Sequence, residues 1–214
     1  MRSALIIGVG QFGSHIAKRM SKLHCEVMAV DINEDRINAI LPYVTNAQIG
    51  DSTNSAFMES LGIPDFDVCI VTISGNFQNS LETTALLKEL GARSVISRAQ
   101  NDVQQKFLLR NGADETVYPE KLTALRLATR AASDSILDYI QMDKNLSIYE
   151  MRVPREWEGK NLIELDIRKK YQLNIIAMRS GKDLTLPTPN TELHEGDDVL
   201  VIGSLRDIQK CFKL

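Results

Sequence analysis

The sequence predicts a doubly wound α/β domain with a parallel sheet, followed by a crossover helix and a small α+β lobe. Up to Pro119, short runs rich in Val and Ile alternate with amphipathic segments. This alternation is typical of parallel strands joined by crossover helices. After Pro119 the alternation stops, and apolar residues continue through one stretch to Ile140. We therefore expect an N-lobe of residues 1–119, a helix within 120–143 and a C-lobe of residues 144–214.

Six strands are expected in the N-lobe. Most are rich in Val and Ile with few charges, as strands buried on both faces of a parallel sheet require. The candidates are Ala4–Ile7, Glu26–Asp31, Ala47–Ile49, Val68–Ile73, Ser94–Arg98 and Glu115–Tyr118. Because the strands alternate with helices, we expect the doubly wound order 3-2-1-4-5-6.

Amphipathic helices are expected between these strands. The first places four apolar residues on one face, namely Phe12, Ile16, Met20 and Leu23. Two later helices, Asn76–Leu90 and Asp102–Asn111, end at Gly91 and Gly112. Glycine is favoured there because the residue that follows a helix often adopts a left-handed conformation.

The stretch from Glu120 to Ile140 is predicted to form one long helix. Its apolar positions occupy more than one stripe, whereas a helix that covers a single sheet needs only one. Two interpretations remain open: a last helix that covers the sheet edge, or a crossover helix that packs on a second copy of the chain.

The C-lobe is predicted to contain three strands and two helices joined by polar turns. The strands are Leu146–Val153, Leu173–Met178 and Val199–Ile202, and the helices are Asn161–Tyr171 and Leu205–Phe212. A unit of this size has a small core, so dimerisation would help to complete it.

Composition excludes several classes of function. The formal net charge of the 214 residues is −3 and no basic tail is present, which argues against a nucleic-acid partner. Cys25, Cys69 and Cys211 lack metal-like spacing, so a reducing cytoplasm is expected. The apolar run Ala4–Ile7 is too short for a signal peptide or a membrane span. Action at a membrane would therefore require a partner.

The residues from Gly8 to Gly13 form a G-x-G-x-x-G motif between the first strand and the first helix. Gly8 permits a tight turn, Gly10 lets a phosphate approach the backbone, and Gly13 lets the helix pack closely on the strand. The helix N-terminus offers unpaired N–H groups and a positive dipole to that phosphate. In this context the motif predicts a nucleotide site of the Rossmann type.

Two acidic positions follow the second and third strands. Asp31 can accept hydrogen bonds from both hydroxyls of an adenosine ribose and would repel a 2′-phosphate. No arginine follows it immediately, so NADP is disfavoured; a helix-capping role for Asp31 is compatible with ribose binding. Asp51 and Ser52 could bond the adenine edge or cap the helix Ala56–Leu61, and both interpretations stay open.

Further candidates follow the remaining strands. The small residues of the segment from Ile73 through Ser74 to Gly75 leave room for a ligand at the topological switch point. Arg98 ends the fifth strand, where a guanidinium can form paired hydrogen bonds with a phosphate. Glu120 begins the long helix, where the dipole already favours a carboxylate.

Catalytic chemistry is not evident in the sequence. His15, His24 and His194 lie in helical or turn segments without an acid/base arrangement. A nucleotide-binding fold without visible catalytic groups indicates a protein that binds a nucleotide as a regulatory ligand and does not convert it. The alternative is a small NAD-dependent oxidoreductase whose active site spans a dimer.

Together these segments resemble the regulator-of-potassium-conductance family, the TrkA- and KtrA-type subunits of bacterial potassium transporters. The resemblance rests on GVGQFG, AVDINE, the Gly50–Thr53 turn, the Arg98–Gln100 segment and GADETVYPEK, and on the C-lobe sequences GKNLIELDIRKKYQLNIIAMRSG and LPTPNTELHEGDDVLVIG. It implies a cytoplasmic regulator that binds NAD(H) or ATP/ADP. It also implies homodimers, formed through the long helix, that assemble into a homo-octameric ring under a membrane-embedded potassium transporter subunit.

The resemblance also implies roles for individual residues. Glu120 would hold a divalent cation beside bound ATP. Gln11 stands where related loops often carry an arginine that reaches a terminal phosphate, and glutamine does not offer the same charge. The implied nucleotide contacts are Gly8, Gly10, Gln11, Phe12, Gly13, Asp31, Asp51, Ser52, Ile73, Ser74, Gly75, Arg98 and Gln100. A cyclic di-AMP site in the C-lobe would involve Ile163, Asp166, Arg168 and Ile175.

Overall fold

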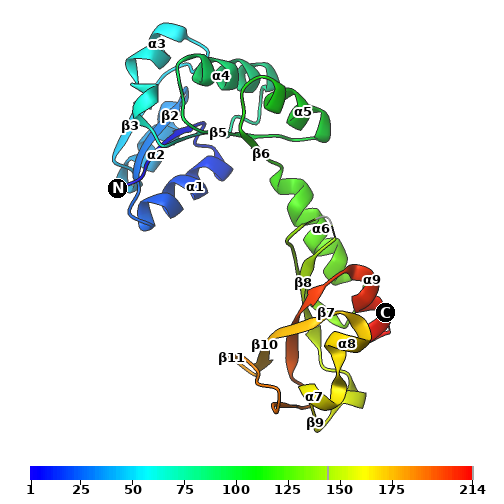
Figure 1. The fold of residues 1–214 in the computed structure, drawn as a ribbon. Coiled ribbons are helices and arrows are strands. Elements are labelled where there is room, and N and C mark those ends of the chain that lie inside the picture. Colours follow the sequence, from blue (N-terminus) through cyan, green and yellow to red (C-terminus); the bar gives the residue numbers. More distant parts are fainter. Residues whose placement is uncertain (144, 214) are drawn as a thin grey trace. The chain divides into compact units, whose positions relative to one another are not determined.

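The computed structural model describes residues 1–143 and 145–213. The chain forms two compact units, Met1–Glu120 and Lys121–Leu214 (Figure 1). Each unit has its own sheet and its own apolar core, so the two are described separately.

Unit 1 is built on a six-stranded parallel sheet. Its strands are β1 (Ser3–Ile7), β2 (Glu26–Asp31), β3 (Asn46–Ile49), β4 (Val68–Val71), β5 (Val95–Arg98) and β6 (Glu115–Val117). The strand order is β3-β2-β1-β4-β5-β6, and all pairs are parallel. The predicted doubly wound order is therefore confirmed.

Helices cover both faces of this sheet. They are α1 (Gln11–Lys22), α2 (Glu34–Ile40), α3 (Ser55–Ser60), α4 (Phe77–Glu89) and α5 (Asp102–Arg110). Successive side chains of β1 point to opposite faces. Leu5 therefore packs in a core with Met58 of α3, and Ile6 packs in a second core with Ala17 of α1. Burial on both faces explains why the central strands are almost purely apolar.

The ends of α4 and α5 follow the predicted capping chemistry. Asn76 and Asn101 cap their N-termini by accepting a hydrogen bond from the backbone N–H of the third helical residue, Asn79 and Gln104 respectively. Gly91 and Gly112, which follow the C-termini, have φ angles of 84° and 113°. These left-handed conformations are costly for residues with a Cβ, which confirms the role predicted for both glycines.

The long helix predicted from Glu120 to Ile140 is wrong in its second half. The helix α6 covers Pro119–Ala131, and Ile136–Gln141 form a strand, β7, of the second sheet. The Ser and Asp residues at 133–135 favour turns over helix, and the β-branched and aromatic residues that follow favour a strand. The apolar residues spread over several helical stripes because the stretch contains two elements with different periods.

Unit 2 is built on a five-stranded antiparallel sheet in the order β11-β10-β13-β8-β7. Besides β7, its strands are β8 (Ser147–Arg152), β10 (Asn174–Ser180), β11 (Asp183–Thr185) and β13 (Asp198–Gly203). A separate two-stranded ladder joins β9 (Lys160–Asn161) to β12 (Glu192–Leu193). The sequence analysis did not predict β7, β9, β11 or β12.

Short helices cover the core of unit 2. They are α7 (Leu162–Leu165), α8 (Ile167–Tyr171) and α9 (Leu205–Phe212), with one 3-10 turn at Arg155–Trp157. The single helix predicted for Asn161–Tyr171 is divided at Asp166, whose φ of 47° is left-handed and breaks the helical path. None of the helices described here has the length and hydropathy needed to cross a membrane.

Candidate functional site

Apart from Glu120 in the first turn of α6, the predicted ligand-contacting residues of unit 1 lie at the carboxyl ends of its parallel strands or shortly after them. Ligands of doubly wound sheets bind at this edge, where the strand order reverses between β1 and β4. The site is therefore described loop by loop along the edge.

The glycine loop after β1 is held in a tight turn. Gly8 has a φ of 89°, and its carbonyl oxygen accepts a hydrogen bond from the Thr72 hydroxyl. A Cβ on Gly13 would lie 2.0 Å from the Gly8 carbonyl oxygen, so only glycine allows α1 to pack this closely. The sequence analysis predicted both glycines but did not identify Thr72, which fastens the loop to β4.

The N-terminus of α1 is open to a phosphate. Its N-cap is Gly10, which has no capping side chain, and no acidic residue lies in the first turn. No atom lies within 4 Å of the position that a Cβ on Gly10 would occupy. The first N–H groups of the helix therefore face open space with a positive dipole, the arrangement that binds anions.

Asp31 at the end of β2 is buried, with 5% of its surface exposed. Its carboxylate accepts hydrogen bonds from the backbone N–H of Val9 at 2.8 Å and of Asn33 at 2.9 Å. Asn33, and not Asp31, is the N-cap of α2. Asp31 thus connects the glycine loop to the start of α2 and is placed to meet a ribose bound beside that loop.

Arg36 lies closer to Asp31 than the sequence suggested. One turn of α2 brings its Nη1 to 3.5 Å from Asp31 Oδ2, while more than half of the arginine side chain stays exposed. No arginine follows Asp31 immediately in the sequence, and the proximity of Arg36 could not be read from that spacing. An exposed guanidinium at this point lowers the electrostatic cost of a 2′-phosphate.

The loop after β3 gives Asp51 and Ser52 different environments. Asp51 is exposed and accepts hydrogen bonds from the Thr53 backbone N–H and hydroxyl, which lower its pKa, the backbone bond first. Ser52 is buried, and its hydroxyl lies 2.8 Å from that of Thr83 on α4. Because Asn54 caps α3, neither Asp51 nor Ser52 is the cap of that helix.

The loops after β4 and β5 meet beside the switch point. Gln100 donates a side-chain hydrogen bond to the Ser74 carbonyl oxygen at 2.8 Å, so these two predicted residues are neighbours. A Cβ on Gly75 would meet no atom within 4 Å. The side chain of Ile73 packs against the apolar core. A contact of Ile73 with a ligand would therefore be made by its backbone.

Arg98, Phe12 and Glu120 form one cluster beside the glycine loop. The Arg98 guanidinium lies over the Phe12 ring, 5.4 Å from its centroid, and forms an ion pair with Glu120. The pKa of Glu120 is lowered, first by a hydrogen bond from its own backbone N–H and then by the one from Arg98. Arg98 Nε is buried and, among the residues described, has no hydrogen-bond partner. The guanidinium therefore keeps one buried donor unsatisfied in this arrangement.

The cation site implied for Glu120 does not fit this unit alone. The described residues contain no cluster of three or more His, Cys, Asp or Glu side chains that could hold a metal ion. At this point of the sheet edge Glu120 is engaged with Arg98. One carboxylate paired with a guanidinium is a poor set of ligands for a divalent cation.

Comparison with protein families gives two matches that together span most of the chain. The TrkA-N domain matches residues 4–119, and the TrkA-C domain matches residues 148–214. The first match covers the sheet edge described above, and the second covers most of unit 2.

Two relatives from Bacillus subtilis (strain 168) align over nearly the whole chain. The Ktr system potassium uptake protein C is 41% identical over 206 residues, which cover 96% of this chain and 93% of the relative. The Ktr system potassium uptake protein A is 37% identical over the same shares of both chains.

Solved structures share the fold at lower identity. The GsuK RCK domain superposes with a TM-score of 0.69 at 20% identity, covering 97% of this chain and 46% of that one. The GsuK channel bound to NAD superposes with a TM-score of 0.68 at 21% identity, covering 100% and 39%. This chain thus spans less than half the length of those chains, and the likeness shows the fold.

Proposed function

Since this chain belongs to the family defined by the TrkA-N and TrkA-C domains, we propose that it is a nucleotide-binding regulatory subunit of a potassium transport system. The family match and the similarity to the Ktr potassium uptake proteins support a role in potassium transport. Ligand binding that shifts an assembly between two shapes would then bias a membrane-embedded transporter subunit.

The ligand proposed for unit 1 is an adenine nucleotide, NAD(H) or ATP/ADP. The observation that carries this proposal is the buried Asp31 carboxylate hydrogen-bonded to the glycine loop. The carboxylate would serve as a ribose acceptor beside a helix N-terminus whose glycine leaves room for phosphate. Arg98, whose guanidinium lies over Phe12 in the first turn of α1, would contact the phosphates.

The oxidoreductase alternative gains no support from this edge. Its ionisable groups are engaged in holding the loops: Asp31 bonds Val9 and Asn33, and Arg98 pairs with Glu120. A hydride-transfer site needs an acid or base that faces a substrate. Steady turnover of NADH with any small carbonyl substrate would favour this alternative.

The assembly belongs to the same proposal. The leucines of α6 are exposed, which supports a homodimer formed through this helix and, through further contacts, an octameric ring at the inner face of the membrane. A divalent cation near Glu120 would need further oxygen ligands from nucleotide phosphates or a second chain. The proposed cyclic di-AMP site includes Ile163, exposed on α7, and Asp166 at the helix break.

Thermal unfolding with and without nucleotide tests the proposal. A ligand present at 100 times its Kd stabilises the folded state by about 2.7 kcal/mol, which raises the unfolding temperature of a domain of this size by roughly 5–10 °C. We expect NAD, ADP or ATP to give such a shift, and Asp31→Ala to abolish most of it relative to that variant's own ligand-free baseline. Asp35→Ala, an exposed acid on α2, is the matched control.

One result would contradict the proposed ligand class, and another would contradict the role of Asp31. The absence of a shift with all three nucleotides would exclude this ligand class. A full shift in Asp31→Ala would remove Asp31 from the site while leaving nucleotide binding intact.

A further inference from the structure

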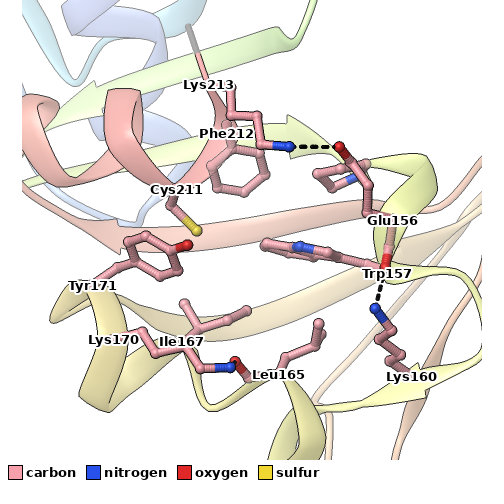
Figure 2. A pocket seen from close by; sticks show the side chains of 11 residues that line it. Glu156, Trp157, Lys160, Leu165, Ile167, Lys170, Tyr171, Cys211, Phe212 and Lys213 are labelled. Atoms are coloured by element: carbon pink, nitrogen blue, oxygen red, sulfur yellow. Dashed lines mark hydrogen bonds and ion pairs between the residues drawn. The ribbon is translucent and has the colours of Figure 1, made fainter.

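Unit 2 contains a hollow that is separate from every site considered above. Its volume is about 240 Å³, and it lies between the 3-10 turn Arg155–Trp157, helix α8 and helix α9 (Figure 2). None of the four residues expected to bind cyclic di-AMP lines it. The hollow therefore needs an explanation of its own.

Aromatic side chains form the walls of the hollow. Trp157 and Phe212 pack against each other with ring centroids 5.0 Å apart and planes inclined by 52°. Figure 2 shows Tyr171 across the hollow from Trp157, with Leu165 and Ile167 on one side. Trp157 and Phe212 are each about nine-tenths buried, so the walls are fixed by the core of the unit and the shape is formed in advance.

The charged side chains at the hollow are predominantly basic. Lys160 and Lys170 donate hydrogen bonds to the backbone carbonyl oxygens of Glu156 and Leu165, at 2.7 and 2.8 Å. These acceptors are neutral, so neither lysine charge is compensated by its bond. Lys213 pairs with the Glu156 carboxylate at 2.7 Å. Three lysines and one glutamate give a net charge of about +2 at the hollow.

Each ammonium group has donors to spare. An ammonium carries three N–H donors, and the bonds described above use one donor of each lysine. Two carbonyl-anchored lysines beside an aromatic wall can therefore accept an anionic group without losing their present partners. Charge-assisted hydrogen bonds of this kind are shorter and stronger than neutral ones.

We propose that this hollow binds a small planar aromatic molecule that carries a carboxylate or a phosphate. The ring would enter between Trp157 and Tyr171, where offset or edge-to-face aromatic contacts are favourable. Its anionic group would contact Lys170, which lies on the Tyr171 side of the hollow and bonds only a neutral carbonyl oxygen in the hydrogen bond described above (Figure 2). The volume admits one ring system with its substituent and is smaller than a typical pocket for a drug-sized ligand, so the ligand class is small.

Bound ligand would connect three segments of unit 2 that are distant in sequence. Trp157 belongs to the turn after β8, Lys170 and Tyr171 lie on α8, and Phe212 ends α9. The proposal thus gives unit 2 a ligand-binding site of its own, which does not depend on the nucleotide site of unit 1.

Tryptophan fluorescence offers a direct test because Trp157 is the only tryptophan of the chain. Four probes separate the contribution of the aromatic ring from that of the anionic group: phenyl phosphate, benzoate, benzyl alcohol and inorganic phosphate. We expect a saturable change with phenyl phosphate and benzoate. Benzyl alcohol and inorganic phosphate, which each lack one of the two features, should bind about tenfold more weakly or not at all.

Charge variants assign the response to this hollow. Lys170→Gln should weaken phenyl phosphate binding several-fold, and Lys160→Gln, which removes the charge on the other side of the hollow, should weaken it less. Lys169→Gln is the matched control, because Lys169 is its neighbour on α8 but does not line the hollow. Cys211→Met, which would extend a side chain between Tyr171 and Trp157 (Figure 2), should block the ring while keeping the lysines.

The proposal fails if neither anionic probe changes the fluorescence saturably at millimolar concentration. It also fails if benzyl alcohol binds as well as phenyl phosphate, since the hollow would then be an apolar void. Equal losses in Lys169→Gln and Lys170→Gln would show that surface charge alone attracts the anion. The surface lysine variants remain decisive even if Cys211→Met does not fold.

Discussion

Gly10 and Gly13 lie in the same loop but are glycine for different physical reasons. The position of a Cβ on Gly10 is open, whereas a Cβ on Gly13 would collide with the Gly8 carbonyl oxygen and with the Thr72 hydroxyl at 2.5 Å. One glycine therefore leaves space for a ligand, and the other lets α1 pack on the sheet.

Alanine at these two positions should separate binding from folding. Gly13→Ala forces α1 away from β1 and should lower the free energy of unfolding by about 2 kcal/mol or more, as overpacking does. Gly10→Ala should cost less than about 1 kcal/mol and weaken phosphate binding. Urea unfolding and calorimetric titration with ADP check both expectations. Loss of stability in Gly10→Ala, with binding intact, would contradict this assignment.

Arg98→Ala should weaken ATP and ADP binding more than adenosine binding. The guanidinium has an unpartnered buried Nε among the described residues and lies beside the glycine loop, so its loss removes charge-assisted bonds to phosphate. Calorimetric titrations with the three ligands measure the difference. Arg93→Ala is the control, because Arg93 pairs with Asp67 before the start of β4, at the opposite edge of the sheet. Equal losses for adenosine and ATP would place Arg98 away from the phosphates.

The residues that backbone geometry dictates could be predicted from the sequence, whereas those that depend on side-chain packing could not. Gly8 and Asp31 follow from a strand, a turn and a helix in succession, because each position permits few residue types. The bond between Ser52 and Thr83 joins residues from different elements. The same is true of Arg98 and Glu120. Both contacts arise only after the chain has folded.

The segment from Glu120 to Ile140 shows how an element can be predicted wrongly. Apolar residues are frequent throughout, so hydrophobicity alone does not reveal where the period changes from helix to strand. The change occurs near Ser133, and Ile136 at the start of the following strand is buried in one core with Tyr149 and Met151. The apolar residues occupy more stripes than one helix needs, and this excess was the available signal that the segment is not a single helix.

Lysine substitutions distinguish the two parts of this segment. Ile136 on β7 is 6% exposed and belongs to the core of unit 2, so Ile136→Lys should unfold that unit because a buried ammonium has no partner there. Leu125 on α6 is 44% exposed, and Leu125→Lys should leave the fold of both units unchanged. Circular dichroism and thermal unfolding of each variant measure whether the fold and its stability are retained. A folded Ile136→Lys unit 2 would refute the placement of β7.

At the scale of the whole molecule, α6 is the clearest candidate for an interface. None of its residues is buried, and three leucines are largely exposed: Leu122, Leu125 and Leu127. Soluble monomers rarely leave such apolar residues clustered on one element. We expect light scattering to find an oligomer at micromolar concentration, and Leu122→Lys with Leu125→Lys to shift it toward monomer. A monomeric wild-type protein would contradict the assembly.

The exposure of α6 also has a consequence for a chain that has not yet assembled. This helix contains three basic residues, Lys121, Arg126 and Arg130, and none of its residues is buried, although Arg126 pairs with Asp138 of β7. Local opening of such a helix requires little free energy, and proteases act on locally opened segments. Surplus copies should therefore be degraded from this point, and a partner copy that covers the helix would protect both chains. The helix that we propose for assembly would thus also limit how much unassembled protein persists in the cell.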